Sequence, residues 1–299
     1  MSNFKGLFKE SSIFSKLLML IGFACFFTLI AISIWMVISD GNSSNIVSLK
    51  ILQMVQATTM FIIPSVLCAY LFSDNTVVFL NLSNKFHFGA VLILISTFIL
   101  AIPFINLVGE FNQQLHLPEA LKHIEDWMKA SELQAKNLTE KILNVSSFEA
   151  LLLNIFLISL LPAIGEEFFF RGVVQNILKN WKGTIVAIWI TAFIFSTIHF
   201  QFYGFIPRLL LGAFLGYLLM WSGNLWIPIL GHFVNNFIAV VFYYLNYNGY
   251  QTINIDTIGT GNSKWIGVVS FFLLIPTILY LRKTFLGYSA ENSLIKNDK

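Results

Sequence analysis

The sequence predicts an all-α, polytopic membrane protein with eight transmembrane helices and an intramembrane active site. Of its 299 residues, 57% are hydrophobic and only 11% are charged, whereas soluble chains are about a quarter charged. Apolar runs of about 20 residues, enough to cross a hydrocarbon core of roughly 30 Å, recur along the chain. Lipid is therefore the expected solvent, because a soluble domain of this size cannot bury so many apolar residues.

Eight apolar runs are the candidate membrane spans. They occupy residues 17–38, 51–72, 88–107, 150–178, 184–200, 206–222, 226–246 and 264–281. The first run is too long for a signal peptide, and no small-residue cleavage site follows it. The second and third contain Pro64 and Pro103, which membrane helices tolerate where neighbours satisfy the freed carbonyl.

The spans divide the chain into four regions. We expect an N-terminal three-helix membrane region at 1–107, an extramembrane insert at 108–148, a four-helix core at 149–246, and a last transmembrane helix with a basic tail at 247–299. Within the insert, apolar residues recur at helical spacing with Glu and Lys between them. This pattern predicts an amphipathic helix on the outer membrane surface, and it leaves the role of the insert open.

Charge placement predicts the orientation and excludes one class of partner. If the chain crosses the membrane eight times, most Lys and Arg residues outside the insert lie on the same side as the N-terminus. Basic residues favour the cytoplasmic side, so we expect both termini in the cytoplasm. We expect the chain to lie in the plasma membrane. The net charge of +3 forms no basic stripe, which argues against a nucleic-acid partner. Cys25 and Cys68 lie in apolar runs and are expected to be packing residues rather than a disulfide.

Ionisable residues inside membrane helices are costly, so each is a functional hypothesis. The candidates are Glu166, Glu167 and Arg171 in the fourth span, His199 at the end of the fifth, and His232 with Asn236 in the seventh. The fourth and fifth spans form a hairpin, and Glu166 and His199 each lie about 16 residues from its turn, roughly 25 Å along a helix. We expect these two at one depth, whereas His232 is only about 12 Å into its own helix.

Helical spacing assigns these residues to faces. Glu167 and Arg171 are four apart and can pair, while Glu166 points about 100° away and is available for another partner. His232 and Asn236 are also four apart and project together. One buried Glu–Arg pair or one histidine is more often a packing feature, but their concentration on three helices of one bundle favours a functional site.

Pro162 lies one turn before Glu166 and has no N–H, which predicts a local kink and an exposed carbonyl there. The residue types suit hydrolysis by an activated water. A carboxylate in apolar surroundings, with a neighbouring His, can accept a proton near neutral pH. A second His and an Asn amide can donate to the developing oxyanion. Ser196 is expected to bond a helix backbone rather than to act as a nucleophile.

At these residues the sequence resembles the CPBP family of CAAX prenyl proteases and bacteriocin-processing enzymes, also called the Abi family. Three motifs carry the resemblance in order across residues 150–246. They are Glu-Glu-x-x-x-Arg at Glu166, Glu167 and Arg171, Phe-x-x-x-His at Phe195 and His199, and His-x-x-x-Asn at His232 and Asn236.

The resemblance implies an intramembrane glutamate-type endopeptidase that needs no metal or cofactor and acts on a peptide or lipidated peptide in the bilayer. Glu166 and His199 would activate water, and His232 and Asn236 would stabilise the oxyanion. Glu167 and Arg171 would support the site. The substrate and the oligomeric state stay open.

Two alternatives compete with this interpretation. One is a metalloprotease with Glu166, His199 and His232 as ligands, although the chain has no His-Glu-x-x-His motif. The other is a non-enzymatic bacteriocin-immunity or scaffold protein, since the family includes members without demonstrated proteolysis.

Overall fold

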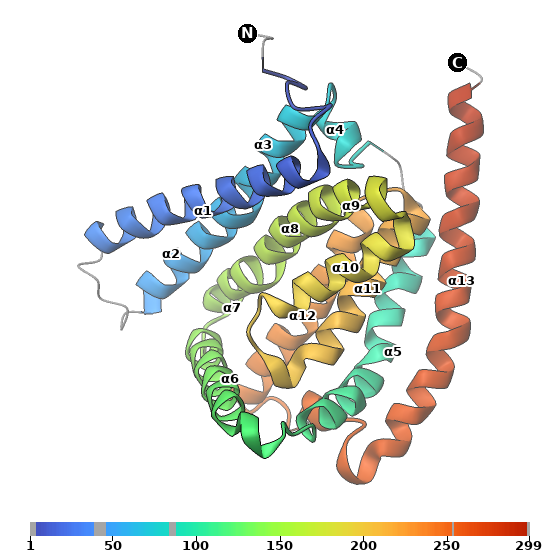
Figure 1. Ribbon diagram of the computed structural model, residues 1–299. Coiled ribbons are helices and arrows are strands. Elements are labelled where there is room, and N and C mark those ends of the chain that lie inside the picture. The colour runs from blue at the N-terminus through green and yellow to red at the C-terminus, as the bar shows by residue number, and fades with distance from the viewer. Residues whose placement is uncertain (1–3, 39–45, 84–87, 253, 298–299) are drawn as a thin grey trace.

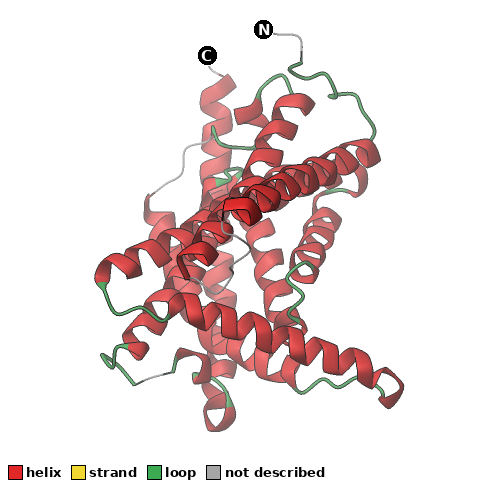
Figure 2. Cartoon of the chain, turned by 90° about the vertical axis from the view of Figure 1, so that its left-hand side faces the viewer, coloured by secondary structure: helices red, strands yellow, loops and turns green. Residues whose placement is uncertain are grey.

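A computed structural model of the protein describes residues 4–38, 46–83, 88–252 and 254–297, and within them every regular element is a helix (Figure 2). The all-α prediction is therefore confirmed for the described residues. Seven helices in this part of the chain are long and apolar enough to cross a bilayer, as expected of an integral membrane protein. They are Ile13–Val37, Ile46–Phe72, Gly89–Gln113, Phe148–Lys182, Phe202–Ser222, Trp226–Tyr247 and Gly261–Gly287.

The predicted fifth span is shorter than the sequence indicates, so the count of eight is not confirmed. Its helix, α10 (Thr184–Thr197), has 14 residues, about 21 Å at 1.5 Å per residue, which is less than the roughly 30 Å core. Phe200 has φ 53°, a left-handed conformation that is uncommon for a bulky residue and incompatible with a continuing helix. The apolar pattern runs to residue 200, but the backbone turns before it.

The first two spans form one flank of the molecule (Figure 1). The second span is continuous but includes a π-helical turn, η1, just before Pro64. The first and second spans pack on each other, and α5 pairs with the last helix on the opposite flank. The elements are α1 (Ile13–Ile38), α2 (Ile46–Ala57), η1 (Thr58–Ile62), α3 (Ile63–Phe72), α4 (Thr76–Phe79) and α5 (Phe88–Gln113).

The insert folds as η2 (Glu119–Leu121) and α6 (Lys122–Leu143), which confirms the helix predicted there. Helix α6 lies across the end of the bundle away from the described chain ends, against α2, α7, α12 and η5 (Figure 1). Part of its apolar side is uncovered, including Ile124, Trp127 and Leu138. Its placement on the outer membrane surface stays a prediction.

The core region lies between the two flanks (Figure 1). Its fourth span alternates α-helical and π-helical segments, namely α7 (Phe148–Asn154), η3 (Ile155–Leu160), α8 (Leu161–Glu167), η4 (Phe168–Val174) and α9 (Gln175–Lys182). The remaining elements are α10, η5 (Phe202–Gly204), α11 (Phe205–Ser222), α12 (Trp226–Tyr247), η6 (Ile255–Thr257), η7 (Gly261–Ser263) and α13 (Lys264–Asn297).

Close backbone packing holds α10 against α11. A Cβ added to Gly212 would lie 3.2 Å from the Cα and the Cβ of Ala192. Small residues allow such approach, which matters in a membrane because packing contacts replace the hydrophobic effect between helices. The Gly212 carbonyl also lies within hydrogen-bond distance of Arg171 in the fourth span.

Candidate active site

A buried ion pair occupies the centre of the fourth span. Arg171 Nη1 donates to Glu167 Oε1 at 2.7 Å, and both side chains are fully buried. Arg171 Nη2 also donates to the Gly212 carbonyl of α11 at 2.9 Å. The sequence predicted this pairing from the four-residue spacing, and the structure adds that Arg171 ties the fourth span to α11.

The histidine of α12 meets both glutamates. His232 Nδ1 is 2.9 Å from Glu167 Oε1, and its Nε2 is 3.9 Å from Glu166 Oε2. The depth mismatch expected for His232 is therefore absent, since α12 packs directly on α8 and η3. The Glu166 side chain remains 14% exposed, against 0% for Glu167. Of the two glutamates, only Glu166 is accessible.

His199 lies in the turn that follows α10. Its Nδ1 donates to the Phe195 carbonyl at 2.7 Å, one of the last carbonyls of a helix, which lack intrahelical donors. Because a carbonyl only accepts, Nδ1 carries the proton and the neutral ring presents a lone pair at Nε2. His199 and His232 both pack against the Phe195 ring, with ring centroids 5.0 and 6.0 Å away. The structure thus brings His199 to the same aromatic ring as His232 rather than into a hydrogen bond with Glu166.

The carbonyl that Pro162 leaves without its helical donor has a partner on α12. Pro162 cannot donate to the Ile158 carbonyl one turn earlier, and that carbonyl accepts from Asn236 Nδ2 at 3.3 Å. The Asn236 Oδ1 accepts from Asn235 Nδ2 at 3.1 Å. Both ends of the Asn236 amide are therefore oriented, and one of its two N–H groups remains for another acceptor.

Two π-helical segments bracket the Glu166–Glu167 pair, with η3 ending just before α8 and η4 starting just after it. Such segments occur frequently at functional sites, because the wider turn redirects side chains and carbonyls. Ser196, in contrast, donates to the Phe205 carbonyl of α11 at 2.7 Å. It bonds backbone as predicted, although on a neighbouring helix.

One charged residue beside this cluster, Arg208, is not among the site residues predicted from the sequence. Arg208 lies in the first turn of α11, close enough to Glu166 and His199 to interact electrostatically with both. The signal was available, since Arg208 falls inside the predicted span 206–222, where an arginine is costly.

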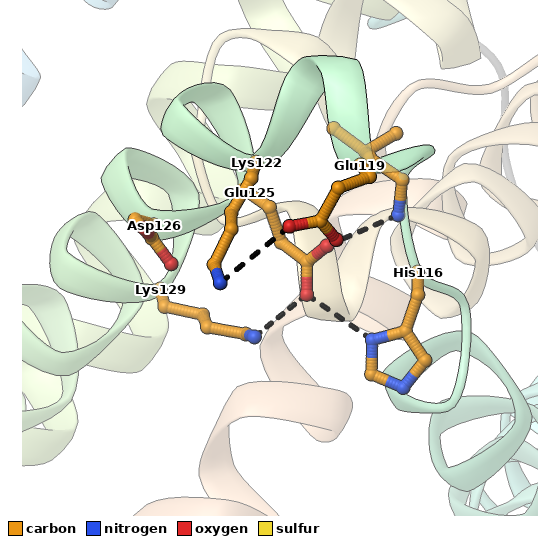
Figure 3. Close-up of a pocket in the computed structure, with 7 residues that line it drawn as sticks. His116, Glu119, Lys122, Glu125, Asp126 and Lys129 are labelled. Atoms are coloured by element: carbon orange, nitrogen blue, oxygen red, sulfur yellow. Dashed lines mark hydrogen bonds and ion pairs between the residues drawn. The ribbon is translucent and has the colours of Figure 1, made fainter.

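A pocket of about 230 Å³ on the insert lies outside this cluster (Figure 3). Its acidic centre, Glu125, accepts from the Leu117 N–H at 3.1 Å and from Lys129 Nζ at 2.6 Å, and it contacts His116 Nδ1 at 3.1 Å. These bonds, led by that of Lys129, lower the pKa of Glu125 from 4.5 to about 2. These hydrogen bonds therefore tie the turn at residues 114–118 to α6.

Nowhere in the described parts of the chain do three or more His, Cys, Asp or Glu side chains form a group that could hold a metal ion.

Comparison with known proteins covers the segment that contains all six predicted site residues. Residues 148–238 match the family model described as type II CAAX prenyl endopeptidase Rce1-like, which confirms the resemblance to CAAX proteases there. The uncharacterized protein YpbD of Bacillus subtilis (strain 168) is 33% identical over 85 residues, which are 27% of this chain and 41% of YpbD. The match thus spans less than half of that relative. No solved structure matches the chain.

Proposed function

Since residues 148–238 match the Rce1-like family of CAAX prenyl endopeptidases, we propose that this protein is an intramembrane endopeptidase that uses Glu166 and His199 to activate water. One observation carries the proposal: the two adjacent glutamates have different environments. Glu167 is fully buried and bonded to Arg171 and His232. Glu166 is 14% exposed and faces His232 Nε2 across 3.9 Å, so its carboxylate is available to a reacting molecule.

In the proposed reaction, Glu166 accepts a proton as the oxygen of a water molecule attacks the peptide carbonyl. His199 assists through the lone pair of Nε2, which the Nδ1–Phe195 hydrogen bond keeps unprotonated in the neutral ring. The new C–O bond forms a tetrahedral intermediate. The C–N bond then breaks, and the proton held by Glu166 passes to the leaving amine.

The oxyanion is stabilised by donors on α12. Asn236 offers the N–H of Nδ2 that Ile158 does not use, and His232, when protonated at Nε2, donates from the ring edge that faces Glu166. Glu167 holds the His232 ring through Nδ1, as a carboxylate orients the histidine of a serine-protease triad. Arg171 balances the charge of Glu167 and is a positioning residue.

The substrate class that fits is a peptide or lipidated peptide reached from the bilayer. The family description names a CAAX prenyl endopeptidase, so the first probe is a quenched peptide with an S-farnesyl cysteine three residues before its carboxyl terminus. Membrane proteomics of cells with wild-type protein or Glu166→Gln provides an unbiased search for native substrates.

We expect Glu166→Gln to yield folded protein that leaves the probe intact and to enrich uncleaved peptides in the membrane fraction. Glu167→Gln, the matched control at the neighbouring position, should instead lower the midpoint of thermal unfolding, because it weakens the bonds to Arg171 and His232. Near-normal turnover by Glu166→Gln would overturn the proposal. Unchanged function in cells would favour an immunity or scaffold role.

The proposed reaction needs no metal, because carboxylate, imidazole and amide groups supply each step. Elemental analysis of purified protein, combined with turnover before and after chelation, tests this. About one zinc ion per chain together with activity lost to chelator would establish the metalloprotease alternative.

We also propose that both termini face the cytoplasm, from the distribution of basic residues in the sequence. The two described ends of the chain lie at the same end of the bundle, opposite α6 (Figure 1), as this orientation requires. Reporter fusions after residue 299 and within α6 should report opposite sides of the plasma membrane. The same side for both would refute it.

A further inference from the structure

Arg208 is a cation in the candidate membrane span Phe202–Ser222. Among the described residues, no carboxylate lies within ion-pair distance of it. It lies in the first turn of α11 and is half-buried. Its nearest polar partner is Gln201, whose carbonyl accepts from Nη1 at 3.2 Å and whose Oε1 accepts from Nη2 at 2.6 Å. Charged residues in such positions are rarely retained for packing alone.

The guanidinium has five N–H donors in a planar fork. Gln201 accepts two of them, so three remain for another acceptor. Two carboxylates, Glu132 of α6 and Glu166 of α8, lie in electrostatic range but not in contact. Both are too far to neutralise the cation by a hydrogen-bonded pair, and the fork is therefore available to an anion.

The short stretch of chain between His199 and Gln201 indicates where an anion bound to Arg208 would lie. Gln201 is two residues after His199, a span of at most about 7 Å of extended chain, and the guanidinium also lies against the Gly204 backbone. An anion on Arg208 would therefore lie beside the proposed catalytic residues. For a peptide whose bond lies between Glu166 and His199, it would be separated from that bond by only a few residues, at roughly 3.3–3.6 Å each.

We propose that Arg208 binds the C-terminal carboxylate of the peptide substrate and so selects bonds a few residues from the end of a chain. This inference rests on the proposed endopeptidase function and deepens it. A planar fork binds a carboxylate through two parallel hydrogen bonds, which are strong where water is scarce. A chain terminus also enters a site between helices more readily than an internal segment, which must thread in both directions.

Direct binding tests the proposal without requiring turnover. Full-length Glu166→Gln protein in detergent is titrated with three fluorescent forms of the farnesylated probe. These carry a free C-terminal carboxylate, a C-terminal amide, or a C-terminal amide with a glutamate as the last residue. We expect the free carboxylate to bind about tenfold or more tightly than the simple amide, as loss of a charge-assisted hydrogen bond predicts. An acidic side chain as the true ligand would instead make the glutamate amide the tightest of the three, and would overturn the proposal.

Added substitutions assign the preference to Arg208. Arg208→Gln should abolish the difference between carboxylate and amide and leave amide binding unchanged, while Arg208→Lys should keep part of it. Arg282→Gln, an exposed arginine on α13, is the matched control and should keep the full difference. If Arg208→Gln weakened both probes equally, Arg208 would only hold the turn after His199, and the proposal would fail.

Turnover by wild-type protein separates this inference from the proposed function. Preferential carboxylate binding without any cleavage would refute the endopeptidase and leave the Arg208 site standing. If the protein cleaved and bound the carboxylate probe and the amide probe equally well, the endopeptidase function would be supported and the Arg208 site would be refuted.

Discussion

His232 and Glu167 form a hydrogen bond of 2.9 Å between α12 and the fourth span. The accepting oxygen, Glu167 Oε1, also receives Nη1 of Arg171, which in turn reaches the carbonyl of Gly212 on α11. Glu167 and Arg171 together therefore connect the fourth span to α11 and α12 through buried contacts. Glu166, the neighbour of that carboxylate, contacts this network through His232, whose Nε2 lies 3.9 Å from Glu166 Oε2.

Arg171→Met should destabilise the protein, because it leaves the Glu167 carboxylate buried without its cation. Removing one partner of a buried ion pair typically costs about 3–5 kcal/mol. We expect a lower midpoint of thermal unfolding and a lower folded yield, measured by fluorescence and by size-exclusion chromatography in detergent. The double variant Arg171→Met with Glu167→Gln should recover part of the loss. Equal stability of Arg171→Met and wild type would show that the pair is dispensable.

Asn236→Ala should lower kcat by about 10² to 10³, as removal of one oxyanion donor does, with little change in KM or folded yield. Asn235→Ala removes only the bond that orients the Asn236 amide, so its effect on kcat should be smaller. Steady-state kinetics of both variants on the farnesylated probe decide between these roles. A larger defect in Asn235→Ala would place the donor on Asn235 instead.

Pro162→Ala supplies an N–H that can bond the Ile158 carbonyl and so competes with Asn236 for it. We expect kcat to fall roughly tenfold, because small displacements of a catalytic group are costly, while the midpoint of thermal unfolding stays the same or rises. Pro276→Ala, at a helix-interior proline of α13 far along the chain, is the control for general helix stiffening. Unchanged kcat in Pro162→Ala would show that the Ile158 carbonyl does not orient Asn236.

The insert should loosen in acid. Glu125 has a pKa lowered from 4.5 to about 2, so its stabilising contribution is fully present above pH 4.5 and is lost as the pH falls toward 2. Hydrogen exchange of residues 114–122 should show faster opening at pH 3 than at pH 7, after correction for the intrinsic rate. Glu125→Gln should reproduce the loosened state at pH 7, whereas Glu119→Gln, at a largely exposed glutamate, should not.

Sequence spacing predicted the faces of single helices well. The four-residue spacing placed Glu167 on Arg171, and Pro162 indicated a carbonyl released from its helix. Both depend only on local helical geometry, which the chain itself determines. The motifs also lie within the segment that matches the Rce1-like family.

Relations between helices were predicted less well, because tilt and helix ends depend on packing. Helical rise alone places His232 only about 12 Å into its helix, and a tilt or displacement of that helix, which the sequence does not show, was needed to bring it to the other candidates. In the structure, α12 brings His232 into contact with Glu167. His199 was placed on a helix but lies in the turn beyond it, ahead of the left-handed Phe200. A hydropathy pattern cannot show where a helix ends if the residues beyond its end are also apolar, as they are here up to residue 200.

The short α10 has a consequence for the surrounding lipid. A helix about 21 Å long leaves a hydrophobic mismatch of roughly 9 Å against a 30 Å hydrocarbon core. A bilayer accommodates a short span by thinning locally, and α10 ends immediately before the turn that holds His199 and Gln201. Thinning at that end would bring the headgroup region and its water toward those two residues. The length of one helix would then shorten the distance that water travels to reach the site.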